Sequence, residues 1–213
     1  HLFPADCVIF RSVPIRGDPV RGPASQCGLF GSRVIDAVSD ALESAQSLWG
    51  QAHRAKAATV DLNAVLKAYQ ALQGREIWKH DGTFIEKYQP TFGPGVKERF
   101  AFAKTVHDKD LTEQESLCEQ AVRHINGLLA DSSVLILPTL PGAGLKLDCS
   151  PDDMNAFRSK MSASFCLGGL AGVPWITLPL AEIDGAPLGV SMVSACGTDA
   201  WLLELSKALV QNR

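Results

Sequence analysis

The sequence lacks several features that would assign it to a class of protein directly. Among its longest apolar stretches are Val134–Leu137 and the region of Trp175–Leu180. Both are far shorter than the roughly 18–20 residues of a membrane-spanning helix, so we expect no membrane as partner. The formal net charge is −3. No basic patch is present that would favour nucleic acid, which we therefore also exclude as a partner.

Short catalytic and cofactor-binding motifs are absent as well. The chain contains no G-x-S-x-G elbow, no S-x-x-K, no H-E-x-x-H and no phosphate loop. Gly142–Ala143–Gly144 lacks the third glycine of a dinucleotide loop. From the residues alone we predict no catalytic residue, no metal ligand and no cofactor, and the function stays open at this point.

No two of the six cysteines form a C-x-x-C pair, and small disulfide-rich secreted domains have a higher cysteine density. We expect reduced, mostly buried thiols and a cytoplasmic location. The chain starts at His1 without the basic-then-apolar layout of a signal peptide. We interpret it as a piece of a longer protein.

Apolar residues at helical spacing predict six helices. These cover residues 33–48, 61–73 with a possible continuation through Trp78, 96–106, 112–130, 152–170 and 199–210. Residues 1–30 and 79–95 are interrupted by proline and glycine and are predicted to be irregular.

Three apolar runs predict strands: Val134–Leu137, Trp175–Leu180 and Leu188–Val193. Asp184–Gly185 between the last two is typical of a hairpin turn. Long helices with a few strands indicate an α/β fold, but three strands are too few for a self-sufficient sheet. We expect the sheet to lack members.

Three motifs, in order, resemble those of amidase-signature enzymes. Val134–Pro141 resembles the strand and loop near the active site of that family. Leu167–Pro179 is similar to its N-x-x-G-x-P-x-x-x-x-P segment, and Asp184–Val193 is similar to its G-x-P-x-G-x-Q-x-I strand, with Ser191 in place of the glutamine. The segments at 73–78 and 92–99 look like the branch that includes plant indole-3-acetamide hydrolases and their bacterial relatives.

The resemblance implies a partial amidase-signature fold, with a mixed sheet covered by helices and the N-terminal part of the sheet missing. Residues 1–30 would be a separate irregular segment, and 31–213 the C-terminal portion of the domain. Thr139, Pro141, Gly172 and Pro174 would line the substrate pocket. The family's catalytic lysine and two serines lie in an N-terminal glycine- and serine-rich signature, which this sequence lacks.

The resemblance therefore implies the C-terminal part of an amidase that cleaves a small carboxamide, and a chain that is inactive alone. Its partners would be the amide substrate and the missing N-terminal half, or another copy of the chain. Two alternatives stay open. The first is a non-catalytic amidase-like module for binding or scaffolding, and the second is an amidotransferase subunit.

Overall fold

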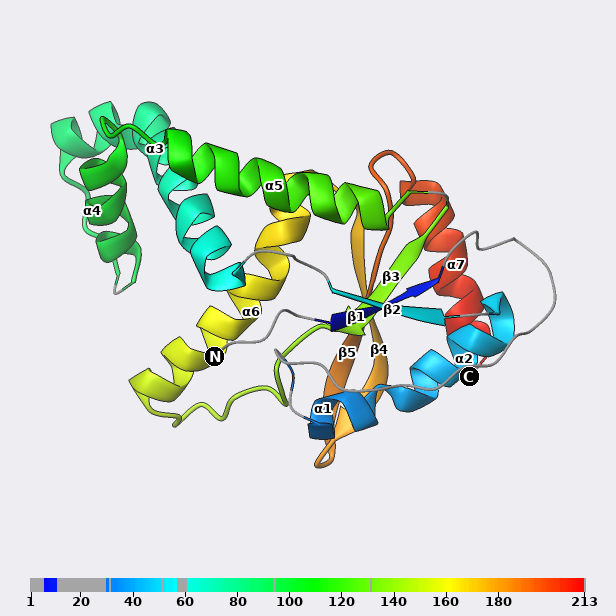
Figure 1. Cartoon of the computed structure of the whole chain (residues 1–213). Coiled ribbons are helices and arrows are strands. Elements are labelled where there is room, and N and C mark those ends of the chain that lie inside the picture. Colours follow the sequence, from blue (N-terminus) through cyan, green and yellow to red (C-terminus); the bar gives the residue numbers. More distant parts are fainter. Residues whose placement is uncertain are drawn as a thin grey trace.

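The computed structural model describes residues 6–10, 30, 32–50, 52–56, 61–93, 95–130 and 132–212. Seven helices and five strands lie within these ranges (Figure 1). The helices are α1 (Ser32–Ala37), α2 (Ser39–Trp49), α3 (Leu62–Tyr88), α4 (Val96–Val106), α5 (Thr112–Leu128), α6 (Pro151–Ala171) and α7 (Asp199–Gln211). The strands are β1 (Asp6–Phe10), β2 (Ala52–Lys56), β3 (Val134–Pro138), β4 (Trp175–Ile183) and β5 (Ala186–Val193).

The strands form one sheet in the order β2-β1-β3-β5-β4. The predicted hairpin is confirmed, because Asp184 and Gly185 both have positive φ values, 54° and 77°, in the turn between β4 and β5. The α/β class is also confirmed. The expected mixed sheet is corrected in one respect: every pairing among the described strands is antiparallel.

Two strands were not predicted. β1 lies inside the segment 1–30 that the sequence predicts to be irregular, and β2 follows α2. Ala52–Lys56 has no alternating or continuous apolar pattern, and the short apolar run Cys7–Phe10 stands among the prolines and glycines of residues 1–30. The rest of the predicted segment, 1–5 and 11–29, lies outside the described residues. The domain boundary at residue 30 stays a prediction.

Helices cover both faces of the sheet. The ring of Trp175 lies against α6, with its centroid 4.9 Å from that of Phe165. On β5, the Met192 sulfur accepts a hydrogen bond of 3.6 Å from the Ser206 hydroxyl of α7. Trp175 is paired with Val193, the next residue after Met192, and adjacent strand residues point to opposite faces. Therefore α6 and α7 lie on opposite sides of the sheet.

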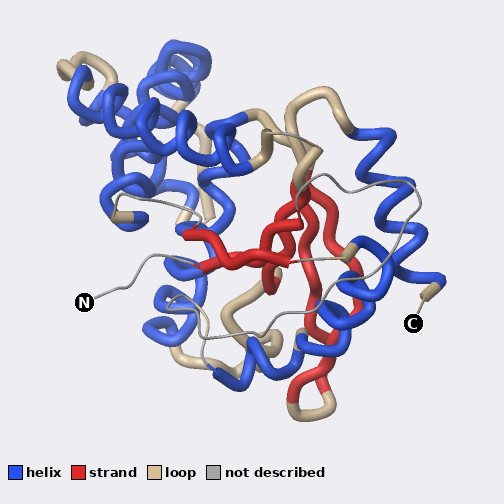
Figure 2. Tube along the Cα trace, turned by 45° about the vertical axis from the view of Figure 1, so that its right-hand side comes forward, coloured by secondary structure: helices blue, strands red, loops and turns tan. Residues whose placement is uncertain are grey.

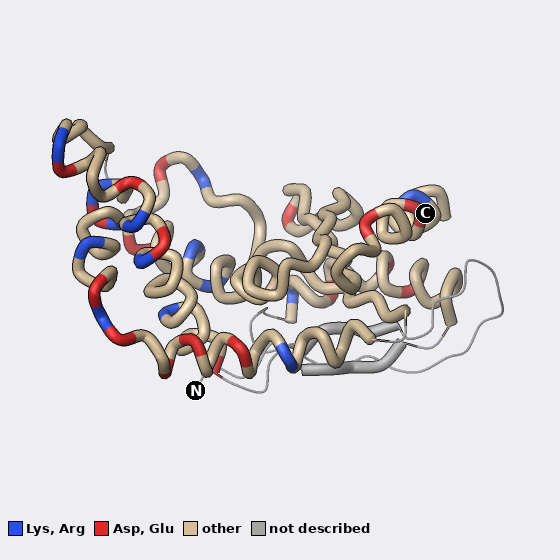
Figure 3. Tube along the Cα trace, turned by 90° about the horizontal axis from the view of Figure 1, so that it is seen from above, with Lys and Arg blue, Asp and Glu red and all other residues tan. Residues whose placement is uncertain are grey.

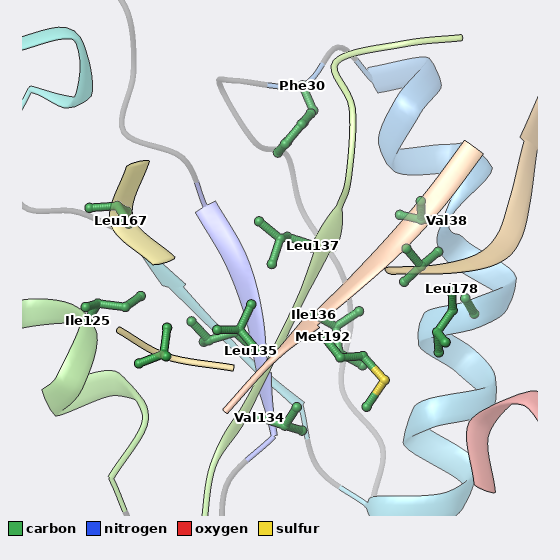
Figure 4. Close-up of a cluster of buried hydrophobic side chains, with 14 of the residues drawn as sticks. Phe30, Val38, Ile125, Val134, Leu135, Ile136, Leu137, Leu167, Leu178 and Met192 are labelled. Atoms are coloured by element: carbon green, nitrogen blue, oxygen red, sulfur yellow. The ribbon is translucent and has the colours of Figure 1, made fainter. Parts of the chain in front are cut away.

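The core follows the same two-sided pattern (Figure 4). Leu135 lies on the side of Ile125 and Leu167, whereas Ile136 and Met192 lie on the side of Val38 and Leu178. All five residues of β3 are buried, which explains its uninterrupted apolar sequence. Each fully buried aliphatic side chain of this kind stabilises the fold by roughly 1.5–3 kcal/mol.

Helix α3 is longer than the sequence predicts. It runs without a break from Leu62 to Tyr88, so the prediction of irregular structure from residue 79 is wrong for its first ten residues. Gly74 does not end the helix. A Cβ there would lie 3.0 Å from the Val106 side chain and 3.3 Å from the Ala103 backbone, so this glycine lets α4 approach closely. The far end of α3 buries few residues, which removes the periodic signal.

Helices α3 and α4 form an arm that extends away from the sheet, as two views show (Figures 1 and 2). Lysine, arginine, aspartate and glutamate residues are interspersed along the helices of the described chain (Figure 3). Within the described ranges, no helix is both long enough and apolar enough to cross a membrane.

Candidate functional site

Thr139 stands at the point where β3 leaves the sheet. Its backbone N–H donates a hydrogen bond of 2.9 Å to the Gly189 carbonyl, which extends the pairing with β5 one residue beyond the strand. Pro141 follows in the loop that leads to α6, and both residues are half-buried. The first two predicted substrate-binding residues therefore lie together where β3 ends.

Three hydroxyl groups meet beside Thr139, and we call Thr139, Thr177 and Ser191 the hydroxyl cluster. The Thr139 and Ser191 oxygens are 2.7 Å apart, and the Thr177 and Ser191 oxygens are 3.2 Å apart. A longer contact of 3.4 Å joins Thr139 to Thr177. Ser191 is fully buried, whereas Thr177 is exposed. The cluster thus links the protein interior to the surface through groups that both donate and accept hydrogen bonds.

Strand register explains why these side chains converge. Ser191 is paired with Leu137 on one side and with Thr177 on the other. Thr139 is two residues beyond Leu137 and therefore points to the same face. The sequence offers a weak signal for this arrangement, since polar residues replace apolar ones on one face of adjacent strands. Without the register, Thr177 and Ser191 could not be placed beside Thr139.

Gly189 makes room for the cluster. An added Cβ would lie 2.6 Å from the Thr139 hydroxyl oxygen and 2.6 Å from the Thr177 methyl carbon. Contacts this short would force both threonines to move. A side chain at this position is therefore incompatible with the cluster as it stands.

Gly172 and Pro174 lie immediately before the start of β4, of which Thr177 is the third residue. Gly172 ends α6 in the left-handed conformation, with φ of 62°, and the Pro174 carbonyl accepts a hydrogen bond of 3.3 Å from the Ser194 N–H. The neighbouring Trp175 is paired with Val193, four residues along β5 from Gly189. Four residues of strand span roughly 13 Å. The structure thus separates the four predicted residues into two pairs, and their role in substrate binding stays a prediction.

The buried thiols have the chemistry of core residues. Burial raises the pKa of Cys166 to about 11, with Cys118 as a smaller cause. Burial raises the pKa of Cys118 as well. The Cys166 thiol donates a hydrogen bond of 3.3 Å to the Ala163 carbonyl within its own helix. Because the thiolate is the nucleophilic form, Cys166 is poorly suited to attack a carbonyl at neutral pH.

Two pockets lie in the helical part of the molecule. One of about 480 Å³ lies between α3, α4 and α6, and its walls include Tyr69, Arg99 and Cys166. The other, of about 700 Å³, lies between the far end of α3 and α4. None of the four predicted substrate-binding residues lines either pocket. Among the described residues, no group of three or more His, Cys, Asp or Glu side chains is placed to hold a metal ion.

Comparison with known proteins confirms the predicted resemblance in sequence and in fold. No protein-family model matches the chain. The structure of a bacterial aryl acylamidase of the amidase-signature family superimposes with a TM-score of 0.69 at 15% identity, covering 95% of this chain and 45% of that one. The chain therefore has part of the amidase-signature fold.

Curated relatives agree with this class. Amidase 1 of Arabidopsis thaliana is 29% identical over 148 residues, which cover 70% of this chain and 35% of the plant protein. The translocon at the outer membrane of chloroplasts 64 of Pisum sativum is 23% identical over 211 residues, which cover 96% of this chain and 35% of that protein. The chain thus spans about a third of the length of these two curated relatives.

Proposed function

We propose that this chain is the C-terminal part of an amidase-signature hydrolase that converts a small carboxamide and water into a carboxylic acid and ammonia. The observation that carries the proposal is the similarity to Amidase 1 over 70% of the chain. The order of the three motifs, from Val134 to Val193, supports the C-terminal position. In this proposal an aryl-acetamide is a fitting substrate.

The nucleophile would come from outside this chain. A serine would attack the carbonyl carbon, a lysine would move the protons through a bridging serine, and backbone N–H groups would hold the oxyanion. The C–N bond would break with release of ammonia, and water would then free the acid. The sequence holds no glycine- and serine-rich run that could supply these groups.

This chain would supply a wall of the substrate pocket. Thr139 and Pro141 lie where β3 leaves the sheet, and the hydroxyl cluster presents hydrogen-bond donors and acceptors there. Gly172 and Pro174 would let backbone approach the acyl side of the substrate, because glycine adds no side chain. A substrate that contacts both pairs would have to extend along β4.

The partners and location complete the proposal. The chain would associate with the missing N-terminal half or with another copy, and would require no cofactor. The net charge of −3 disfavours nucleic acid as partner. The six cysteines form no C-x-x-C pair and are sparser than in disulfide-rich secreted domains, which favours a cytoplasmic location. Fractionation of cells that express the tagged chain would test this location.

The upstream coding sequence tests the proposal most cheaply. An in-frame lysine followed by a glycine- and serine-rich signature is expected. The corresponding N-terminal polypeptide, mixed with this chain, should then release ammonia from phenylacetamide, and its nucleophilic Ser→Ala variant should not. A degraded signature, or a mixture without turnover, would contradict the hydrolase proposal.

A non-catalytic binding module is the second candidate. The match to the translocon at the outer membrane of chloroplasts 64 favours it, because that match extends over 96% of this chain. The same coding sequence separates the two candidates. If the upstream sequence continues the amidase-signature fold but has other residues in place of the catalytic lysine and serines, the binding module would be favoured.

A further inference from the structure

The larger pocket of the helical arm has the features of a small-molecule site, and we call it the arm pocket. It lies between the far end of α3, residues 89–92 and α4, and is an open pocket of about 700 Å³. Ligand sites in proteins usually enclose about 300–1,000 Å³. The arm pocket contains no residue of β3, β4 or β5, so it is separate from the candidate site at the sheet.

Aromatic rings form its apolar walls. Phe92, from the turn before α4, stacks on Phe100 of α4 with ring centroids 4.6 Å apart. Trp78 of α3 is 8% exposed and also lines the arm pocket. Trp78 is covered by Lys104 and His107, whereas the half-buried rings of Phe92 and Phe100 remain partly open for an aromatic ligand to stack on.

The charged residues of the arm pocket do not balance. Lys104 pairs with Glu86 at 2.7 Å, and its ammonium lies 5.4 Å from the centre of the Trp78 ring. The hydrogen bond from Lys104 lowers the pKa of Glu86, and the carboxylate of Glu86 offsets the charge of Lys104. Lys97, which also lines the pocket, has no ion-pair partner within the described part of the chain. One positive charge is thus left over.

We propose that the arm pocket binds a small aromatic carboxylate, with its ring against Phe92 and Phe100 and its carboxylate at Lys97. The stacked rings select a planar apolar body, and the lysine selects an anionic end. A neutral aromatic amide of the same shape would stack equally well but would gain no charge-assisted hydrogen bond. The proposal rests on the arm alone and does not depend on the proposed hydrolase function.

Isothermal titration calorimetry of the full chain with 2-naphthoate and with 2-naphthamide tests this proposal. We expect 2-naphthoate to bind at least about tenfold more tightly than the amide, since a charge-assisted hydrogen bond is roughly twice as strong as a neutral one. Added salt should weaken the binding of naphthoate and leave that of naphthamide unchanged.

Variants locate the site. K97M removes the charge and keeps most of the apolar stem, so its affinity for naphthoate should fall to that for naphthamide. K160M, which removes an exposed lysine on α6, is the matched control and should bind as the unaltered chain does. F100L should weaken both ligands. Circular dichroism of each variant checks that the fold is kept.

Three results would overturn the proposal: no binding of 2-naphthoate at about 1 mM, the weak end of measurable affinity; equal affinity for acid and amide; or unchanged affinity in K97M. The first two use the unaltered chain and do not depend on whether a variant folds. None of these results bears on amide hydrolysis, which concerns the sheet.

Discussion

The hydroxyl groups of Thr139 and Ser191 lie 2.7 Å apart, across the point where β3 leaves the sheet beside β5. This contact ties a residue predicted to bind substrate to a fully buried one. Ser191 stands where the resemblance to amidase-signature enzymes would place a glutamine. The Ser191 hydroxyl lies within hydrogen-bond distance of both Thr139 and Thr177.

Replacing Ser191 tests whether the hydroxyl cluster stabilises the fold. S191A should lower the free energy of unfolding by about 1 kcal/mol, because the hydrogen bonds to Thr139 and Thr177 are lost in a buried place. Urea unfolding measures this, with S159A on the exposed surface of α6 as control. If the two variants are equally stable, the cluster contributes nothing to stability.

Gly189 should tolerate no side chain. G189A places a methyl group 2.6 Å from the Thr139 hydroxyl and the Thr177 methyl, and overpacking of this kind costs about 1–3 kcal/mol. G144A is the control, because nothing lies within 4 Å of a Cβ at that loop position. Thermal unfolding compares the stability of the G189A and G144A variants. A G189A variant as stable as G144A would show that the strands adjust freely here.

Two helical glycines, Gly127 near the end of α5 and Gly74 within α3, should respond differently to replacement by alanine. G127A should stabilise the chain by about 0.5–1 kcal/mol, since alanine favours helix and the position on α5 is open. G74A should lose this gain, because its methyl group would meet Val106 and Ala103 of α4. Chemical denaturation measures the free energy of unfolding of both variants relative to the unaltered chain. Equal stabilisation would contradict the close packing of α3 against α4.

The Cys166 thiol should make stability depend on alkaline pH. Its pKa is about 11, against an ordinary value of 9.0, so the unfolded chain loses this proton first. The stabilisation is fully present below pH 9 and is lost as the pH rises to 11, an effect of roughly 2–3 kcal/mol. Between pH 8 and pH 10.5, the free energy of unfolding should fall less in C166S than in the unaltered chain, because serine does not ionise in this range. The exposed thiol variant C196S should keep the full decrease, and parallel decreases in all three would contradict this account.

Sequence reasoning recovered most of the elements that bury a periodic face. The strands at 134–137 and 175–193 and the helices around them follow directly from apolar spacing. The far end of α3 was missed because it is solvated on most sides and its glycines suggest breaks. No apolar pattern marks β2, and the short apolar run of β1, Cys7–Phe10, lies in a segment rich in proline and glycine that indicates irregular structure.

The candidate site was only partly accessible from sequence. Thr139 could be proposed because it follows a buried strand in a family-like motif, but its partners Thr177 and Ser191 lie 38 and 52 residues away. Only strand register brings them together. The separation of Gly172 and Pro174 from Thr139 and Pro141 likewise depends on the direction of β4, which motif order does not specify. The arm pocket was missed because part of its wall lies where irregular structure was expected.

The central proposal is that this chain carries part of the amidase-signature fold and lacks the catalytic nucleophile. The most direct test is ammonia release from phenylacetamide by the purified chain alone, together with labelling by a fluorophosphonate probe for activated serines. The account predicts neither turnover nor labelling, under conditions in which an active amidase used as positive control gives both. Turnover that is abolished by replacing one serine of this chain would contradict it.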